Sequence, residues 1–377
     1  MDLHDLRALF PHTQHQTYLH HAAIAPLSMP VRQAVDDYLD QRNRTNVENY
    51  FDVMPTMLET RERLARLIGA PVERVEFAQN TSAALNVLAD GFDWRPGDRI
   101  AVPACEFPAN VYPFLNLADR GVTVDFIPHD RGVFTLDDVA RTLTPQTRLV
   151  SVSWVQFLSG YRVDLHALGQ LCADRDVLLC VDAIQGLGAF SLDVDACQID
   201  FLACGGHKWL MGPMGQGFLY LTEALQAQLR SPAGWLHGPV DWDNFFDYDL
   251  AFHDDATRFR LGTTNNLGIM GLHAALGLRE QCGGDWCTDR VCLLTDHLRK
   301  GLQSLGLTVY GPADQDQAGG IVTIEHGNPE ALFEALGRAN VKAGLRNRMI
   351  RMAPTYYNCI DDVERAIEVV GAFLKRN

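Results

Sequence analysis

The alternation of short apolar runs with helical patterns is the feature that most constrains the fold of this chain. Each of three runs rich in Val, Ile and Leu is followed by a helical pattern: 74–78 by 82–89, 99–103 by 110–117, and 149–154 by 165–173. The runs are continuously apolar, which is typical of strands covered on both faces. The repeated order of strand and helix therefore predicts an α/β fold with a mostly parallel central sheet.

From about residue 265 the pattern changes and predicts a second, smaller unit. A long helical stretch at 267–302 is followed by strand-like runs at 307–310, 320–324 and 349–352 and by helices at 329–338 and 361–374. A chain of 377 residues suffices for two domains. We expect a large domain over 15–265 and a smaller α+β domain over 266–377, with residues 1–14 packing nearby.

The composition excludes several classes of protein. Hydrophobic residues make up 47% and charged residues 21%, as in ordinary soluble globular proteins. The net charge of -15 disfavours binding to nucleic acid and to anionic membranes. The N-terminus lacks the apolar core of a signal peptide, and no long apolar run occurs elsewhere. We therefore expect a cytoplasmic protein with neither a nucleic-acid nor a membrane partner.

The nine cysteines are scattered through apparent core segments and indicate free thiols. Cys282, Cys287 and Cys292 are five residues apart, so each step along a continuous helix would turn the side chain by roughly 140°. No close CxxC pair occurs. We expect structural thiols and no metal site.

Lys208 lies in a glycine-rich, apolar segment that begins at Asp200 and includes Gly205, Gly206 and His207. An ammonium group removed from water loses its charge or finds a covalent partner. A neutral lysine amine is the form that Schiff-base catalysis uses. The alternative is that Lys208 is an ordinary solvated lysine. The neighbouring motifs distinguish between these two interpretations.

Segment 79–88 supplies a candidate phosphate cradle. A strand ends there, and Thr81 and Ser82 open the following helix. Free backbone N–H groups, the helix dipole and two hydroxyl groups would attract an anion at that point. Capping of the helix alone is the alternative interpretation.

Two further residues are expected at the same edge of the sheet. Asp182 follows the apolar run 177–181, and open α/β sheets bind ligands at the carboxyl ends of their strands. A pyridinium nitrogen would satisfy its charge, although an acidic turn residue is the alternative. Phe107 follows the strand at 99–103 and can stack on a planar cofactor, with a core role as the alternative.

In this order, the motifs resemble those of the class V aminotransferase family of pyridoxal-phosphate enzymes. That family contains cysteine desulfurases, kynureninases and isopenicillin-N-epimerase-like proteins. The most specific match is Asp182-Ala-Ile-Gln185 followed by Gly206-His-Lys208, and supporting matches run from Tyr18-Leu-His-His-Ala-Ala to Ile350-Arg-Met-Ala-Pro. The resemblance implies fold type I, pyridoxal 5′-phosphate as the cofactor and an amino acid as the substrate.

The resemblance also implies roles for individual residues. Lys208 would form the Schiff base with the cofactor and move the Cα proton, and Asp182 would keep the pyridine nitrogen protonated. Arg351 would bind the substrate carboxylate with its bidentate fork. The residues implied to contact the cofactor are Thr81, Ser82 and His207 at the phosphate, Phe107, Gln156 and Gln185 at the ring, and Gly262 and Thr263 from a partner subunit. The last pair implies a homodimer with its active site at the interface.

Two departures from the family pattern narrow the chemistry. Gly205 stands where many relatives have serine, so one phosphate hydroxyl is missing. Desulfurases carry a catalytic cysteine on a loop before the substrate arginine, but segment 341–349 contains none, and Cys359 lies beyond Arg351. A persulfide-forming desulfurase is therefore disfavoured.

We predict a pyridoxal-phosphate-dependent lyase or transferase that removes the Cα proton of an amino acid. β-Elimination of the C–S lyase type comes first, aminotransfer second and epimerisation third. A cofactor-binding protein without turnover is a further alternative. A nucleotide-binding oxidoreductase is disfavoured because the glycines of segment 212–217 lack GxGxxG spacing. Further candidates for the substrate pocket, with surface or core roles as alternatives, are His20, His21, Arg348 and Tyr356.

Overall fold

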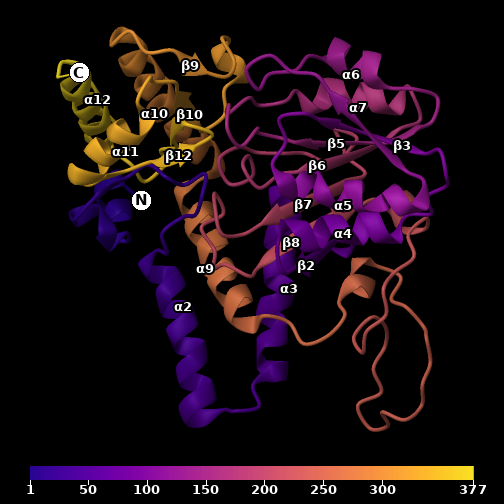
Figure 1. The fold of residues 1–377 in the computed structure, drawn as a ribbon. Helices are drawn as coiled ribbons and strands as arrows, with labels where there is room; N and C mark the ends of the chain where they lie inside the picture. The colour runs from indigo at the N-terminus through magenta and orange to yellow at the C-terminus, as the bar shows by residue number, and fades with distance from the viewer. Residues whose placement is uncertain (377) are drawn as a thin grey trace.

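The computed structural model describes residues 1–376 and contains a central seven-stranded sheet (Figure 1). Its strands are β2 (Val75–Ala78), β3 (Arg99–Pro103), β4 (Thr123–Ile127), β5 (Thr147–Ser153), β6 (Leu178–Asp182), β7 (Phe201–Gly205) and β8 (Gly217–Leu221). They lie in the order β2-β8-β7-β6-β5-β3-β4. Strands β7, β6, β5, β3 and β4 pair in parallel, and β8 pairs antiparallel with both β7 and β2. The predicted α/β fold with a mostly parallel sheet is confirmed.

Helices cover both faces of this sheet (Figure 1). On one face lie α4 (Thr81–Gly91) and α5 (Tyr112–Leu115), and on the other lie α6 (Leu136–Thr142) and α7 (Leu165–Ala173). Successive strand residues pack into different cores: Cys180 joins the cluster under α4, and Leu179 and Val181 join the cluster under α7. Continuous apolarity in the strands follows from this two-sided burial.

The C-terminal part contains a separate antiparallel sheet in the order β12-β13-β10-β9. Its strands are β9 (Val309–Tyr310), β10 (Val322–Ile324), β12 (Gly344–Arg346) and β13 (Met349–Met352), and the helices that pack with it are α10 (Gly284–Ser304), α11 (Pro329–Arg338) and α12 (Ile360–Leu374). Their buried side chains form a core of their own.

The predicted helix at 267–302 is instead two helices, α9 (Asn266–Cys282) and α10, which meet at Gly283. The apolar spacing continues across the junction, but Gly283 has φ of 89°, outside the range of a helix. As a result the thiols of Cys282 and Cys287 come within hydrogen-bonding reach of each other, which a continuous helix would have prevented. The predicted helix at 110–117 is also shorter, because α5 is a single turn between 3₁₀-helical turns.

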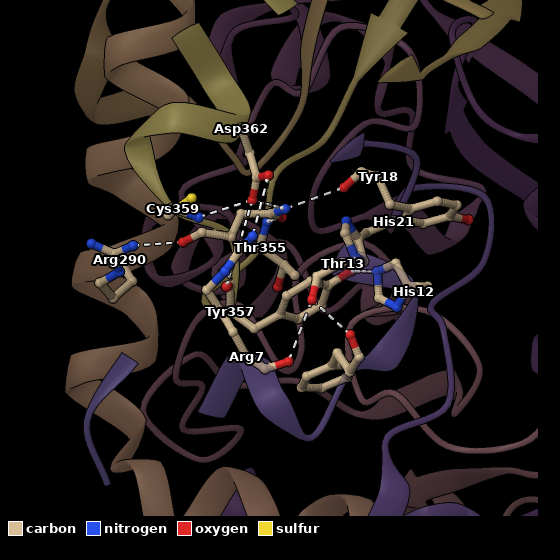
Figure 2. Close-up of polar contacts among 12 residues, drawn as sticks. Arg7, His12, Thr13, Tyr18, His21, Arg290, Thr355, Tyr357, Cys359 and Asp362 are labelled. Carbon is tan, nitrogen blue, oxygen red and sulfur yellow. Dashed lines mark hydrogen bonds and ion pairs between the residues drawn. The ribbon is translucent and has the colours of Figure 1, made fainter. Parts of the chain in front are cut away.

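The N-terminal segment packs on the C-terminal part (Figure 2). Helix α1 (Leu3–Ala8) carries Arg7, whose Nη1 lies 2.6 Å from a carboxylate oxygen of Asp362. The Tyr357 hydroxyl lies 2.7 Å from His21 Nε2 and 3.0 Å from His12 Nε2. Strand β1 (Thr17–Tyr18) then pairs in parallel with β11 (Val341–Lys342). Strands β1 and β11 thus form a two-stranded sheet of their own, and the N-terminal segment is held on the C-terminal part of the chain.

Helices α2 (Met29–Asp40) and α3 (Tyr50–Leu67) extend away from the central sheet, and each packs on α9 (Figure 1). The chain after α8 (Glu223–Gln226) forms a long excursion before α9 begins. Across the described residues, no helix has both the length and the apolarity needed to cross a membrane.

Candidate active site

A cavity of about 320 Å³ lies at the carboxyl ends of the parallel strands. It is lined by Thr81, Ser82, Phe107, Asp182, Gln185, His207, Lys208 and Arg351 among the predicted site residues. The first two follow β2, Phe107 follows β3, Asp182 ends β6, and Lys208 follows β7. The sheet thus brings together residues that lie far apart in the sequence, at the edge where such folds bind ligands.

The turn that carries Lys208 is fixed by close backbone contacts. The Gly206 N–H donates to the Gln216 carbonyl at 2.8 Å, and the Met211 N–H donates to the Lys208 carbonyl at 3.0 Å. A Cβ atom on Gly206 would lie 2.9 Å from the Gln216 carbonyl oxygen. The glycine is therefore required for this approach, and it places the lysine side chain in the cavity.

The N-terminus of α4 carries the groups that the predicted anion cradle requires. Asn80 caps the helix by accepting a hydrogen bond from the Ala83 N–H at 2.9 Å. The Thr81 hydroxyl is buried and has no protein partner, and Ser82 is exposed at the cavity. Gly205 adjoins this site, because a Cβ there would lie 3.2 Å from Thr81 Oγ1. A phosphate would satisfy the free hydroxyl and the first N–H groups of the helix.

Lys208 and Asp182 have pKa values shifted in opposite directions. Burial lowers the pKa of Lys208 to about 8, and the carboxylate of Asp182 partly opposes that shift. Burial raises the pKa of Asp182 to about 7, although Oδ1 accepts a hydrogen bond from the Ile184 N–H at 3.0 Å. A larger fraction of the lysine is therefore neutral near neutral pH than for a solvated lysine, and the carboxylate favours a protonated nitrogen as its partner.

Phe107 and Gln185 face the space between these two groups. The Phe107 ring centroid lies 5.7 Å from Lys208 Nζ, and the residue is 45% exposed and lines the cavity. Gln185 Nε2 donates to the Ala22 carbonyl at 2.9 Å, and its Oε1 accepts from Trp209 Nε1 at 2.9 Å. These bonds fix the amide and leave its second N–H available for a ring oxygen.

Three predicted cofactor residues do not line the cavity. Gln156 is 1% exposed, and its Nε2 donates to the buried carboxylate of Glu106 at 2.6 Å. Gly262 and Thr263 lie in a bend before α9, with Thr263 exposed to solvent. Within one chain these two residues stay apart from Lys208, and their predicted role depends on a partner subunit.

Arg351 lies on β13 and is 3% exposed. Its Nη1 donates to the Phe157 carbonyl at 2.6 Å, whereas its Nε is buried without a partner. Burial and the nearby Arg346 lower the pKa of Arg351 to about 10. A buried guanidinium with a free N–H is suited to bind a carboxylate.

The hairpin that carries Arg351 has a turn of two residues, Asn347 and Arg348, between β12 and β13. Both have positive φ, 47° and 58°, as in a type I′ turn. No long loop therefore extends from this hairpin. Arg346, the last residue of β12, also lines the cavity.

Sequence reasoning missed Arg346, Asn80 and Phe157 as cavity residues. Asn80 lies in segment 79–88 and could have been predicted as the N-cap of the helix that begins there. The place of Arg346 at the cavity could not be predicted from the sequence motifs. It depends on the length of the turn, which determines whether the residue lies over the cavity or away from it.

The additional pocket candidates are not among the cavity-lining residues. His21 is fully buried, and its Nδ1 lies 2.7 Å from the Ala353 carbonyl oxygen. Tyr356 is also buried, with its hydroxyl at Met211 Sδ. Arg348 is exposed and pairs with Glu330 at 3.1 Å. His20 lies close enough to Arg351 for that charge, together with burial, to lower the histidine pKa to about 4.

Comparison with known proteins agrees with this geometry. The family model of class-V aminotransferases matches residues 17–365. A probable cysteine desulfurase of Methanothermobacter thermautotrophicus is 31% identical over 317 residues, which cover 82% of this chain and 78% of that protein. The uncharacterized aminotransferase YcbU of Bacillus subtilis is 28% identical over 97% of this chain and 96% of its own length.

Solved structures extend the likeness to the fold. The apo structure of a cysteine desulfurase from Thermococcus onnurineus has a TM-score of 0.90 at 26% identity, covering 99% of this chain and 98% of that chain. The cystine C-S lyase C-DES, in complex with cysteine persulfide, has a TM-score of 0.89 at 21% identity, covering 96% of this chain and 99% of that chain. At this identity the likeness concerns the fold alone. This chain belongs to the class V aminotransferases, pyridoxal-phosphate-dependent enzymes of fold type I.

Proposed function

We propose that the protein is a C–S lyase that removes the Cα proton of a sulfur-containing amino acid and eliminates the sulfur group from Cβ. The observation that carries this proposal is the short hairpin before Arg351. Its two-residue turn leaves no loop on which a catalytic cysteine could reach the cavity, and no cysteine is found among the described residues that line it. The sulfur would therefore leave for solvent and not for a protein thiol.

The remaining residues fit the requirements of such a reaction. Arg351 binds the α-carboxylate of the substrate through its unpartnered Nε–H and orients the Cα–H bond. Lys208, whose pKa burial lowers to about 8, takes the proton from Cα as the neutral amine. When bound, pyridoxal phosphate supplies the electron sink for the pair left at Cα. Asp182 holds a proton on the pyridine nitrogen, and Thr81, Ser82 and the N-terminus of α4 bind the phosphate.

Phe107 orients the reacting groups by covering one side of the cavity beside Lys208. Its ring also packs edge-on against Phe157, with centroids 5.2 Å apart. Two aromatic rings in the cavity wall reduce the access of water to the amine. We assign Gln156 the supporting task of holding Glu106, since their hydrogen bond fixes the segment before Phe107.

We also propose a homodimer in which Gly262 and Thr263 complete the partner's phosphate site. An aromatic patch supports this proposal, formed by Tyr50, Phe51, Trp235, Trp242 and Phe245. Trp242 is 44% and Phe245 55% exposed, and Trp235 adjoins Gly262. Exposed apolar patches of this kind mark protein interfaces.

We also propose a cytoplasmic location, which the acidic composition and the free thiols support.

Aminotransfer is the second candidate, because it uses the same lysine and arginine and one relative is named an aminotransferase. Incubation of the holoenzyme with a panel of amino acids separates the candidates. Pyruvate with sulfide or a thiol is the result expected for the lyase, whereas a keto acid without release of sulfur indicates aminotransfer, and exchange of chirality indicates epimerisation. Lys208→Ala should abolish turnover and the absorbance band of the Schiff base between the lysine and the cofactor. Absence of any product from the whole panel would refute the enzymatic proposal.

A further inference from the structure

Two guanidinium groups face the cavity, although the α-carboxylate of a substrate requires only one. Arg351 is buried on β13, and Arg346 lies on the adjacent strand β12 of the same hairpin. Both line the cavity. The phosphate cradle is formed by other elements, α4 and the turn that carries Lys208. The two arginines therefore both belong to the substrate side of the site.

The charges of these arginines are not balanced by the protein. Arg346 donates to the carbonyl of its own neighbour Leu345 at 2.8 Å, and Arg351 donates to the Phe157 carbonyl. Over residues 1–376, no carboxylate forms an ion pair with either side chain. The charge of Arg346 also lowers the pKa values of Arg351 and Lys208. Like charges held side by side are unfavourable until an anion joins them, so the site is built for more than one negative group.

We propose that Arg346 binds a second anionic group, carried by the side chain of the substrate. The inference rests on the proposed C–S lyase function and specifies its substrate class: a cysteine derivative with a negative charge beyond its sulfur atom. The cavity of about 320 Å³ is at the lower end of the usual range for ligand sites. Since it must also hold the cofactor, the anionic substituent is short.

S-sulfocysteine represents this class. Elimination breaks its Cβ–S bond, and the electron pair leaves with the sulfur as thiosulfate. The proton removed from Cα goes to Lys208. Addition of one water to the remaining three-carbon enamine gives pyruvate and ammonium, and one proton is released to solvent overall. No oxidant or reductant is required.

Kinetics with two matched substrates test the assignment. The neutral comparison is S-(methylthio)cysteine, which carries a methylthio group where S-sulfocysteine carries a sulfonate. We expect Arg346→Met to reduce the ratio of kcat/KM for S-sulfocysteine to kcat/KM for the neutral substrate by about tenfold, because an exposed charged hydrogen bond is lost. The control is Arg348→Met, which removes the same charge from the same hairpin outside the cavity and should leave the ratio unchanged. An equal loss for both substrates, or no change with Arg346→Met, would overturn the inference.

A binding measurement separates failure of this inference from failure of the lyase proposal. If no cysteine derivative yields pyruvate, the lyase proposal fails, and calorimetry on the holoenzyme still tests Arg346. Succinate and butyrate have the same chain length, but only succinate carries a second carboxylate. Tighter binding of succinate that is lost in Arg346→Met supports the anion site. Equal binding of the two acids, or a preference that Arg346→Met retains, contradicts it.

Discussion

At the residue scale, Asp182 and Lys208 determine the protonation chemistry of the cavity. Their pKa values move toward each other, to about 7 and about 8, because burial penalises both charged forms. Neither residue has a protein partner that removes this penalty. In the described chain Asp182 accepts a hydrogen bond from the Ile184 N–H, and Lys208 lies beside the Phe107 ring. The two residues are therefore suited to a ligand with two functional groups: an aldehyde, which reacts with the Lys208 amine, and a basic nitrogen, which Asp182 keeps protonated.

Asp182→Asn should shift the pH dependence of cofactor uptake. Lys208 reacts with the aldehyde only as a neutral amine, so the rate of uptake by the apoprotein should rise with pH and level off above about 8. The carboxylate of Asp182 stabilises the ammonium form, and its removal lowers the lysine pKa. The inflection should therefore move to lower pH, as measured by stopped-flow absorbance.

Asp176→Asn is the matched control for this experiment. Asp176 is exposed and has φ of 54°, which asparagine adopts readily. The inflection should stay at its wild-type pH. If Asp182→Asn leaves the inflection in place or moves it to higher pH, then the Asp182 carboxylate does not stabilise the ammonium form of Lys208.

At the scale of elements, the end of β7 lies against the start of α4. Gly205 leaves the room that this contact needs, because a Cβ there would come within 2.9 Å of Ile184 Cδ1. That atom is the end of a flexible side chain and can rotate away. A small side chain at position 205 is therefore tolerated, and a hydroxyl on it would lie beside Thr81 Oγ1.

Gly205→Ser should bind pyridoxal phosphate more tightly, by roughly threefold or more, because the serine adds a hydrogen bond to a charged group. Gly205→Ala introduces the same Cβ without the hydroxyl and should show no such gain. Equilibrium dialysis of the cofactor measures both variants. Equal affinities for the serine and alanine variants would show that the missing hydroxyl does not limit binding.

The junction of α9 and α10 depends on the backbone freedom of Gly283. Its φ of 89° and ψ of 128° are unfavourable for any side chain. Gly283→Ala should reduce the free energy of unfolding by about 1–3 kcal/mol. Gly337→Ala lies inside α11 with open space around its Cβ and should instead increase it by roughly 0.5–1 kcal/mol. Urea denaturation of the two variants gives the comparison, and a loss of stability in both would argue against backbone strain as the cause.

At the scale of the whole molecule, the sequence predicts the residues whose chemistry depends on strand ends. Asp182 and Lys208 follow apolar strands, and parallel strands bring their carboxyl ends to one edge whatever the details of packing. The remaining features depend on packing or turn length. Gln156 is directed toward Glu106 because that carboxylate is buried beside it. The position of Arg346 follows from the two-residue turn, and the break at Gly283 follows from one backbone angle.

The homodimer that the family resemblance implies is the largest-scale property of the molecule, and the aromatic patch allows it to be tested. Trp242 contacts Phe51, Trp235 and Phe245 while remaining 44% exposed. Trp242→Ser should weaken the dimer, detected by analytical ultracentrifugation as a larger share of monomer at low concentration. Because Gly262 and Thr263 would then be withdrawn from the partner's phosphate site, cofactor affinity should fall as the dimer dissociates. Leu293→Ser removes an equally exposed apolar side chain from α10 and should change neither property. A monomeric wild-type protein with full cofactor affinity would contradict the shared site.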